Sequence, residues 1–486
     1  MPTTQNNPSF RYLILGLGQS GAAAARWCAR QGHALRLADT RCHPPQLEAL
    51  QAELADAKPQ WVLGPEALNP AVLDQVDALV VSPGLAPTDP ALAKLLAEAE
   101  VQGVECLNEL TLFARALQHA ERSRGYRPQV AAITGTNGKT TVACMVAHLL
   151  AAQSVQAQLA GNISPALLDA WLQCEQQQRW PEVWVVECSS FQLHGQQDFQ
   201  PQVGALLNIS QDHLDWHGSM TAYQAAKQRL LMQSSRVVIN AQDPVVLELA
   251  QQVATEQRWL FATETPHTAQ MMGLCDEQTL PVLCWADAQG QRHQLAPANI
   301  LSMPGAHQVQ NALAALAIIA ALDRPVADCV GALADFQGAP HRCAFVRRLR
   351  DINFINDSKG TNVGATVAAL TGLPGAKVVI AGGLGKGQNF YPLAAAAAQG
   401  QVQHWVLFGA DAPAIAQVLA QQGLAYTQVA HLQAAVQTAF KLAAPDQTVL
   451  FSPACASMDQ FKNYEARGQA FVEAVEELAL ELGEVL

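Results

Sequence analysis

The chain has 486 residues, of which 50% are hydrophobic and 14% charged, and its formal net charge is -12. Single hydrophobic cores stop growing at about 250–300 residues, so this length predicts several domains. The negative charge argues against a nucleic-acid-binding face, which needs clustered Lys and Arg side chains to neutralise phosphates. Anionic ligands would therefore need local cationic pockets.

Targeting and cysteine patterns favour a cytoplasmic protein. The N-terminus carries no charged segment ahead of its short apolar run, so we expect no secretory signal. The longest apolar stretch, residues 312–322, is about half of a membrane span. Eleven cysteines are scattered without a C-x-x-C pair, which predicts reduced thiols rather than a disulfide framework or a zinc site.

Strand-like and helical patterns alternate in three series along the chain. The first runs from Tyr12 to about residue 112, the second begins at "VAAITG" and the third follows "FQGAPHR". Such alternation predicts parallel sheets covered by helices. The polar segment 118–129 predicts the first linker, whereas residues 264–298 have no predicted role. We therefore predict an α/β protein of three domains: a Rossmann-like domain (1–122), a P-loop-type domain (128–338) and a second Rossmann-like domain (339–486).

The string "AAITGTNGKTTV", residues 131–142, predicts a phosphate-binding loop. Gly135 and Gly138 allow backbone angles that let successive N–H groups converge on an anion, and the following helix N-terminus adds positive potential. Lys139 would meet the β- and γ-phosphates, and Thr140 would ligate magnesium. The loop departs from the pattern G-x-x-x-x-G-K-[ST], because Ile133 replaces the first glycine. The alternative is an ordinary strand–helix turn.

A second glycine pattern lies near the N-terminus. Gly16, Gly18 and Gly21 form G-x-G-x-x-G after a strand, and Asp39 ends the next strand. This arrangement indicates NAD binding with Asp39 on a ribose hydroxyl, or glycines that serve only helix–sheet packing. Thr40 and Arg41, which follow Asp39, suit a diphosphate or a base edge instead.

Further polar residues follow predicted strands in the second and third series. Glu187 closes the strand "VWVVE", where P-loop proteins place a carboxylate that holds magnesium. Arg342 and Asp357 would close onto the ribose and phosphates of ATP across a domain cleft, although an interdomain ion pair is the alternative. The loop "GGLGKG" and residues 452–468 are dense in small residues and could bind a carboxylate.

The strings "TGTNGKTT", "ECSSFQL", "NISQDHLDWHG" and "SPACASMDQFKNYEARG" resemble the Mur ligase family, amide-forming enzymes of peptidoglycan synthesis. The loop of this family also lacks the first Walker glycine. The resemblance covers most of the chain and is strongest to the branch of the family that adds D-glutamate. It implies an ATP- and Mg²⁺-dependent ligase, with two ions, that joins D-glutamate to UDP-N-acetylmuramoyl-L-alanine through an acyl phosphate. We expect a monomer with neither nucleic-acid nor membrane partners.

The resemblance also implies a role for individual residues. The implied catalytic residues are Lys139, Glu187, His213 and Lys227, and the implied magnesium-site residues are Thr140, Glu187, His213 and Lys227. The implied ATP contacts are Gly135, Thr136, Asn137, Gly138, Lys139, Thr140, Thr141, Asn311, Arg342 and Asp357. The implied UDP-substrate contacts are Gln19, Ser20, Asp39, Thr40, Arg41, Gly84, Asn162 and His213, and those of D-glutamate are Thr361, Lys386, Ser457 and Tyr464.

Lys227 has the most unusual implied role, because the family resemblance makes it a carbamylated lysine that helps to bind the second magnesium ion. Roughly one lysine in 2,500 is neutral at pH 7, so burial or nearby cations must lower its pKa before it reacts with carbon dioxide. The string "HQVQNALAA" departs from the family because Gln308 stands where an Asn is usual. No general base is evident, and His213 is a candidate.

Two other function classes remain open from the residues alone. A dehydrogenase would use the N-terminal glycine pattern and bind NAD(H). A P-loop nucleotide switch or binding module would hydrolyse ATP without an amine substrate.

Overall fold

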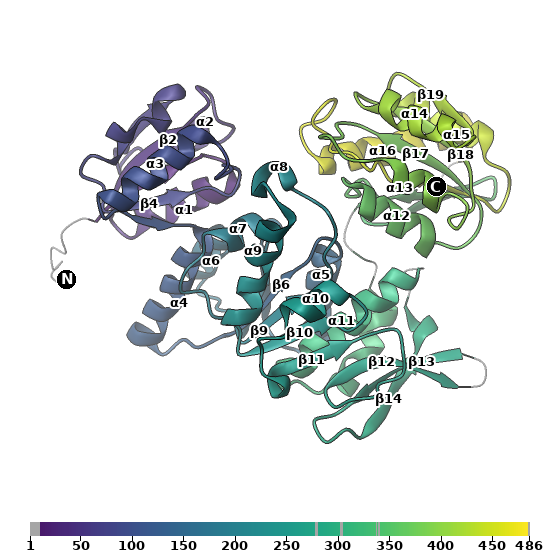
Figure 1. Cartoon of the computed structure of the whole chain (residues 1–486), viewed down its shortest axis with the longest axis horizontal. Helices are drawn as coiled ribbons and strands as arrows, with labels where there is room; N and C mark the ends of the chain where they lie inside the picture. The colour runs from purple at the N-terminus through teal and green to yellow at the C-terminus, as the bar shows by residue number, and fades with distance from the viewer. Residues whose placement is uncertain (1–9, 278–279, 302–304, 337, 339–340, 485–486) are drawn as a thin grey trace.

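The computed structural model describes residues 10–277, 280–301, 305–336, 338 and 341–484. Figure 1 shows three lobes, each built around its own sheet, with the N-terminal and C-terminal lobes on either side of the central one. The predicted three-part α/β architecture is therefore present. The sheets fall within the predicted domain limits, and the limits themselves stay a prediction.

The N-terminal lobe is a parallel five-stranded sheet with the order β3-β2-β1-β4-β5. Its elements are β1 Arg11–Leu15, α1 Gln19–Arg30, β2 Ala34–Asp39, α2 Leu47–Glu53, β3 Gln60–Leu63, β4 Ala78–Val81, α3 Pro90–Val101 and β5 Glu105–Leu107. Tyr12 and Ile14 of β1 pack into one core, whereas Leu13 and Leu15 pack into another. Both faces of the sheet are thus covered, as expected for parallel strands.

The predicted first linker at 118–129 is wrong for residues 118–124, because these form the last turns of α4 (Glu109–Arg124). Asn108 caps the start of α4 by accepting from the backbone of Thr111, and Gly125 ends it in the left-handed region. Phe113 packs edge-on against Trp171, so α4 joins the core of the central lobe. The polar residues that suggested a linker lie on the exposed side of this helix.

A buried carboxyl group lies where α4 meets the two neighbouring lobes. Glu109 is 2% exposed, and its Oε1 accepts a hydrogen bond of 3.1 Å from the backbone N–H of Leu168. Its Oε2 is buried without a hydrogen-bond partner. Burial raises the pKa of Glu109 to about 7, although the backbone of Leu168 and the Ser20 hydroxyl oppose the shift.

The substitution Glu109→Gln is expected to make the protein less sensitive to pH. Because the folded-state pKa is raised, the stability linked to protonated Glu109 is complete below about pH 4.5 and is lost as the pH rises through about 7. The variant should therefore gain stability relative to the wild type between pH 5 and pH 8, by up to roughly 3 kcal/mol. Urea denaturation of both proteins at the two pH values measures this gain. An equal difference at both pH values, or the same gain in exposed Glu100→Gln, would contradict it.

The central lobe is a nine-stranded sheet with the order β14-β13-β12-β11-β10-β9-β6-β8-β7. The strands are β6 Gln129–Thr134, β7 Ala157–Gly161, β8 Val183–Glu187, β9 Val203–Leu206, β10 Arg236–Asn240, β11 Arg258–Phe261, β12 Met271–Glu277, β13 Leu280–Ala286 and β14 Arg292–Pro297. The helices are α5 Lys139–Ala152, α6 Leu167–Gln177, α7 Ser190–His194, α8 Leu214–His217, α9 Met220–Gln233, α10 Pro244–Leu249 and α11 Ala306–Ala321.

The segment without a predicted role contains three strands, β12, β13 and β14, which extend this sheet at one edge. Strand β13 is antiparallel to both of its neighbours, β12 and β14, and β12 continues the parallel part beside β11. Cys275 and Cys284 form a disulfide between β12 and β13, so the prediction of reduced thiols is wrong for this pair. Neighbouring antiparallel strands bring two cysteines nine residues apart together, which a search for C-x-x-C spacing does not detect.

The C-terminal lobe is a six-stranded sheet with the order β15-β16-β20-β17-β18-β19, in which only β15 is antiparallel. Its elements are β15 Ala344–Leu349, β16 Ile352–Asn356, α12 Val363–Gly372, β17 Lys377–Gly382, α13 Tyr391–Ala396, β18 Val402–Phe408, α14 Ala412–Gln421, β19 Tyr426–Gln428, α15 Leu432–Leu442, β20 Thr448–Phe451 and α16 Tyr464–Glu481. In the described part of the chain, no helix is both long and apolar enough to cross a membrane.

Candidate active site

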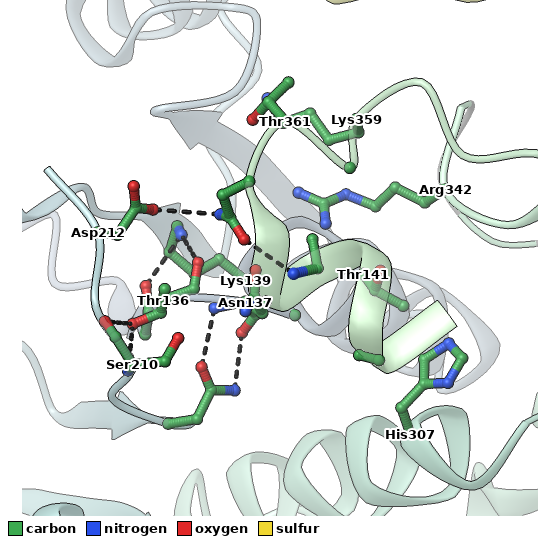
Figure 2. Close-up of a pocket in the computed structure, with 18 of the residues that line it drawn as sticks. Thr136, Asn137, Lys139, Thr141, Ser210, Asp212, His307, Arg342, Lys359 and Thr361 are labelled. Atoms are coloured by element: carbon green, nitrogen blue, oxygen red, sulfur yellow. Dashed lines mark hydrogen bonds between the residues drawn. The ribbon is translucent and has the colours of Figure 1, made fainter. Parts of the chain in front are cut away.

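A cavity of about 620 Å³ lies between the central and C-terminal lobes. Figure 2 shows Arg342, Lys359 and Thr361 on one side of it, with Thr136, Asn137, Lys139 and Ser210 on the other. Most of the predicted ATP and metal residues line this cavity: Gly135, Thr136, Asn137, Gly138, Lys139, Thr141, Glu187, His213, Lys227, Asn311, Arg342 and Asp357. Asn162 and Thr361 line it as well.

The glycine loop has the form predicted for phosphate binding. Gly138 has a φ of 84°, and a Cβ there would lie 2.7 Å from Oδ1 of Asn311, so only glycine fits without displacement. The ammonium group of Lys139 donates to the carbonyl oxygens of Gly135 and Thr136 at 2.9 and 2.8 Å. Ile133 lies in β6 and is fully buried, which explains the missing glycine: the strand continues through that position.

Glu187 is the centre of a polar group at the end of β8. It is fully buried, and its Oε2 accepts a hydrogen bond of 2.6 Å from the hydroxyl of Thr140. Its Oε1 accepts from the side-chain amide of Asn162 at 2.8 Å. Arg342, from the C-terminal lobe, donates to the same Thr140 hydroxyl at 2.6 Å. The two lobes therefore meet at the first turn of α5.

The alternative of an interdomain ion pair through Arg342 and Asp357 is not observed among the described residues. Asp357 accepts instead from the Ser452 hydroxyl at 2.7 Å and from the backbone N–H of Cys343 at 3.3 Å. Burial raises the pKa of Asp357 to about 6, with the Ser452 hydrogen bond and Arg342 opposing that rise. The Nε of Arg342 is buried without a partner.

Lys227 is 1% exposed, although the sequence pattern alone made it an exposed helix residue. Its ammonium donates to the carbonyl oxygen of Gly135 at 2.8 Å and to the Thr134 hydroxyl at 3.2 Å. Lys139 contacts the same Gly135 oxygen, so the two amines lie close together. Burial, and next the charge of Lys139, hold the pKa of Lys227 well below its ordinary value. Both effects shift the pKa of Lys227 in the direction that carbamylation requires.

His213 lines the same cavity as Lys139 and Lys227. Its Nε2 is 3.4 Å from a carboxylate oxygen of Asp212, and Asn362 of the C-terminal lobe donates to that oxygen at 3.2 Å. Burial lowers the pKa of His213, with Lys139, Lys227 and Lys386 acting in the same direction and Asp212 against it. His213 thus favours its neutral form, in which one ring nitrogen can bind a metal or accept a proton.

A second cavity of about 400 Å³ adjoins the first and contains two of the predicted D-glutamate residues, Thr361 and Lys386. The two cavities share one wall, formed by Ser210, Asp212, His213, Thr361 and Gly364. Ser457 is buried beside Ala456, which lines the second cavity, and is itself not part of the lining. Tyr464 lines neither cavity; its ring lies 3.7 Å from the ammonium of Lys359.

The predicted UDP-substrate residues of the N-terminal lobe lie apart from these cavities, at the C-terminal ends of β1, β2 and β4. A Cβ at Gly21 would lie 1.8 Å from the carbonyl oxygen of Gly16, so that glycine serves packing. Nothing lies within 4 Å of a Cβ at Gly18 or Gly84, which leaves both backbones open to a ligand. The close contact at Gly21 supports the interpretation that the glycine pattern serves packing. The open backbone at Gly18 leaves room for a ligand at that glycine.

Asp39 organises this edge of the N-terminal sheet. It is 2% exposed and accepts a hydrogen bond of 2.6 Å from the backbone N–H of Leu17 and bonds of 2.8 Å from the guanidinium of Arg41. Burial alone would raise the pKa of Asp39, but these hydrogen bonds outweigh it and lower the pKa. Thr40 and Gln19 are exposed and Ser20 is partly so, which leaves them accessible to a ligand.

Sequence reasoning gave no role to three residues of the main cavity. Asn208, just beyond β9, exchanges hydrogen bonds of 2.8 and 3.0 Å with the backbone of Asn137 and so holds the phosphate loop. The sequence feature that could have indicated this role is an Asn just after β9, a strand that neighbours β6. Lys359 lines the cavity, and burial lowers its pKa to about 8. Tyr223 bonds the Thr136 hydroxyl at 2.9 Å, and nothing in the sequence marked that contact.

The residues around Glu187 fit a magnesium ion by the type of their donor atoms. The described residues contain no cluster of three or more His, Cys, Asp or Glu side chains suited to a metal. Glu187 and Thr140 instead supply hard oxygen donors 2.6 Å apart beside the phosphate loop. Magnesium is commonly held by one or two carboxylates and completes its shell with phosphate oxygens and water.

Three family models match the chain in the order of its lobes. The Mur ligase MurD-like N-terminal domain matches residues 10–107, the Mur ligase middle domain matches 133–319, and the Mur ligase glutamate ligase domain matches 341–455. Together they span most of the sequence. The chain therefore belongs to the Mur ligase family, and the predicted fold class and the prediction of a ligase are confirmed.

Individual relatives extend this similarity over nearly the whole chain. The UDP-N-acetylmuramoylalanine–D-glutamate ligase of Bordetella avium is 46% identical over 495 residues, covering 98% of this chain and 97% of that protein. The ligase of the same name from Ralstonia nicotianae is 44% identical over 496 residues, covering 98% of each. The crystal structure of UDP-N-acetylmuramate–alanine ligase from Thermotoga maritima shares the fold, with a TM-score of 0.58 at 18% identity over 96% of this chain and 99% of that one.

Proposed function

We propose that the protein joins D-glutamate to UDP-N-acetylmuramoyl-L-alanine at the expense of ATP, as a step of peptidoglycan precursor synthesis. The relatives that carry this activity in their names are 43–46% identical to the chain over nearly its full length. The observation that carries the proposal is the wall shared by the two cavities, one beside the phosphate loop and one beside Lys386. An acid activated in the first cavity lies next to an amine bound in the second.

The proposed reaction begins with attack of the L-alanine carboxylate on the γ-phosphorus of ATP. A carboxylate oxygen forms the new P–O bond, and ADP leaves with the electrons of the broken bond, which gives an acyl phosphate. Lys139 and Arg342 converge on the first turn of α5 and offset the repulsion between the carboxylate and the phosphates. Two unit charges about 4 Å apart repel by about 4 kcal/mol at an effective dielectric of 20, so local cations decide whether the groups can meet.

In the second step the D-glutamate amine attacks the acyl carbon, and phosphate leaves the tetrahedral intermediate with the oxygen that the carboxylate contributed. Thr361 and Lys386 would orient the carboxylates of the amino acid. Neutral His213, in the shared wall, is the candidate to accept the proton that the amine loses; because a neutral imidazole has one free ring nitrogen, this role is the alternative to holding magnesium. Enclosure between the lobes protects the mixed anhydride from water.

Thr140, Glu187, His213 and Lys227 would hold magnesium, and we propose two ions. When bound, magnesium neutralises phosphate charge and polarises the transferred group. Lys227 would contribute as a carbamate: its lowered pKa favours the neutral amine that adds to carbon dioxide, and its contact with Gly135 places it at the phosphate loop. The ATP contacts Thr136, Asn137, Thr141 and Asn311 and the substrate contacts Gln19, Ser20, Thr40, Arg41, Gly84, Asn162, Ser457 and Tyr464 are part of the same proposal.

Measuring phosphate release with each substrate left out in turn tests the function. Release that requires ATP, the UDP-muramoyl-alanine acceptor and D-glutamate together supports the proposal. Phosphate release that needs neither co-substrate would instead indicate a nucleotide switch, and an NAD-dependent absorbance change would indicate a dehydrogenase. A panel of amino acids in place of D-glutamate tests the amine specificity. A cytoplasmic location and a monomeric state accompany the proposal, and light scattering of the purified protein tests the latter.

A further inference from the structure

Arg467, in the first turns of α16, is the most deeply buried cation of the C-terminal lobe. It is 0% exposed, and it forms no ion pair with a carboxylate in the part of the chain that the structure describes. Its Nη2 donates to the carbonyl oxygen of Ser358 at 2.8 Å, and its Nε donates to the Ser358 hydroxyl at 3.2 Å. Its Nη1 donates to the carbonyl oxygen of Cys455 at 3.0 Å. One guanidinium thus ties together two loops that follow different strands.

A third loop lies against the same guanidinium. A Cβ at Gly383 would lie 3.1 Å from Nη1 of Arg467 and 2.4 Å from the carbonyl oxygen of Ala456, so this glycine is in close contact with both. Gly383 opens the loop that follows β17 and carries Lys386. Arg467 therefore lies where the loops after β16, β17 and β20 meet. Each of these loops carries one residue proposed to contact the amino acid: Thr361, Lys386 and Ser457.

We propose that Arg467 is a positioning residue that fixes these three loops around the amino-acid substrate. The inference rests on the proposed function and deepens it, because it assigns the amino-acid half of the site a buried support. Arg467 does not itself line either cavity, so it acts through the loops rather than on the substrate.

The chemistry of arginine suits this role. The planar fork presents donors in several fixed directions, so one side chain can reach carbonyl oxygens on two loops at once. An ammonium group offers a single point of charge and cannot reproduce that geometry. Burial lowers the pKa of Arg467 to about 10, opposed by Cys455, Asp459 and Asp357, and the group therefore stays charged at neutral pH. A buried cation without a carboxylate is costly, and here backbone carbonyls stabilise it.

The ATP half of the site has separate anchors. Asp357 precedes Ser358, but it is held by the Ser452 hydroxyl and the backbone of Cys343 rather than by Arg467. The phosphate loop is held by Asn208 of the central lobe. Loss of the Arg467 fork should therefore weaken amino-acid binding selectively.

The test compares Arg467→Lys with the wild-type enzyme in steady-state phosphate release, varying one substrate at a time. We expect the KM for D-glutamate to rise at least about tenfold, because hydrogen bonds from a buried charge are lost. We expect the KM values for ATP and for the UDP-substrate to stay within about twofold of the wild type. Arg347→Lys is the matched control, since Arg347 also ties α16 to a strand, through Glu476, away from the three loops.

Chemical rescue provides the second readout. Arg467→Ala should recover D-glutamate-dependent activity when millimolar guanidinium is added, because the ion has the shape and charge of the lost group, whereas a merely destabilised protein would recover none. An unchanged KM for D-glutamate in Arg467→Lys, or an equal rise in all three KM values, would overturn the inference. A wild-type enzyme that releases no phosphate in response to D-glutamate would overturn the proposed function instead, so the two failures are distinguishable.

Discussion

Replacing Lys139 with Ala is expected to reduce phosphate release at least about 1,000-fold, because a cation that meets the transferred phosphoryl group contributes on that scale. The Lys139 ammonium already lies in the phosphate loop, 2.9 and 2.8 Å from the carbonyl oxygens of Gly135 and Thr136. Both contacts lie within the loop itself, and α5 begins at this residue without a side-chain cap. The rate should therefore fall while the protein stays folded.

Binding of the UDP-substrate separates this loss from a general defect. The residues proposed to hold the uridine diphosphate lie in the N-terminal lobe, around Asp39, so the Lys139→Ala variant should bind that substrate about as tightly as the wild type. Isothermal titration calorimetry without ATP measures this affinity. Lys94→Ala, an exposed lysine of α3, is the matched control and should keep full activity. Normal turnover by the Lys139 variant would remove the proposed role.

Lys227→Ala is expected to lose roughly 100-fold or more in turnover and to regain part of it in acetate or formate. The reason is the proposed carbamate: a small carboxylate can occupy the space left by the truncated side chain and restore the negative charge. Burial and the charge of Lys139 hold the pKa of Lys227 well below its ordinary value, which favours the neutral amine that carbamylation requires. Initial rates across a carboxylate titration measure the rescue.

Lys377→Ala provides the matched control for that experiment. Lys377 is equally buried, and its ammonium donates to the backbone carbonyl oxygens of Gly375 and Gly400 at 2.6 and 2.9 Å, whereas that of Lys227 donates to one carbonyl oxygen and one hydroxyl. It lies in the C-terminal lobe, outside both cavities, so carboxylates should not restore whatever activity that variant loses. Full activity of Lys227→Ala, or equal rescue of both variants, would show that the carbamate is not needed.

The sequence predicted the place of the glycine loop between a strand and a helix, and the ends of the neighbouring strands, because each of these signals is local. The glycines, Lys139 and Thr140 are consecutive, and the apolar spacing of α5 follows at once. Glu187 was found because a buried strand ends in an acid. The three α/β series likewise predicted the three sheets that the structure contains, because an alternation of strands and helices is compatible with few other arrangements.

Features that depend on contacts between distant segments could not be predicted in this way. Residues 118–124 are mostly polar and were therefore predicted to be a linker. They belong to a helix whose buried side packs against Trp171 and its neighbours, a contact that the local sequence does not reveal. The burial of Lys227 follows from the packing of α9 beside the phosphate loop, not from any pattern around that lysine. Arg467 looked like an ordinary residue of a C-terminal helix, because the three loops that it contacts come together only in the folded chain.

The path of one oxygen atom tests the central claim most directly. UDP-N-acetylmuramoyl-L-alanine labelled with ¹⁸O in both oxygens of its alanine carboxylate is allowed to react with ATP and D-glutamate, and the released phosphate is analysed by mass spectrometry. Transfer of the γ-phosphoryl group to that carboxylate predicts one ¹⁸O atom in each phosphate released, with the other retained in the new amide. Unlabelled phosphate, formed alongside amide product, would contradict an acyl phosphate and with it the mechanism proposed for this site.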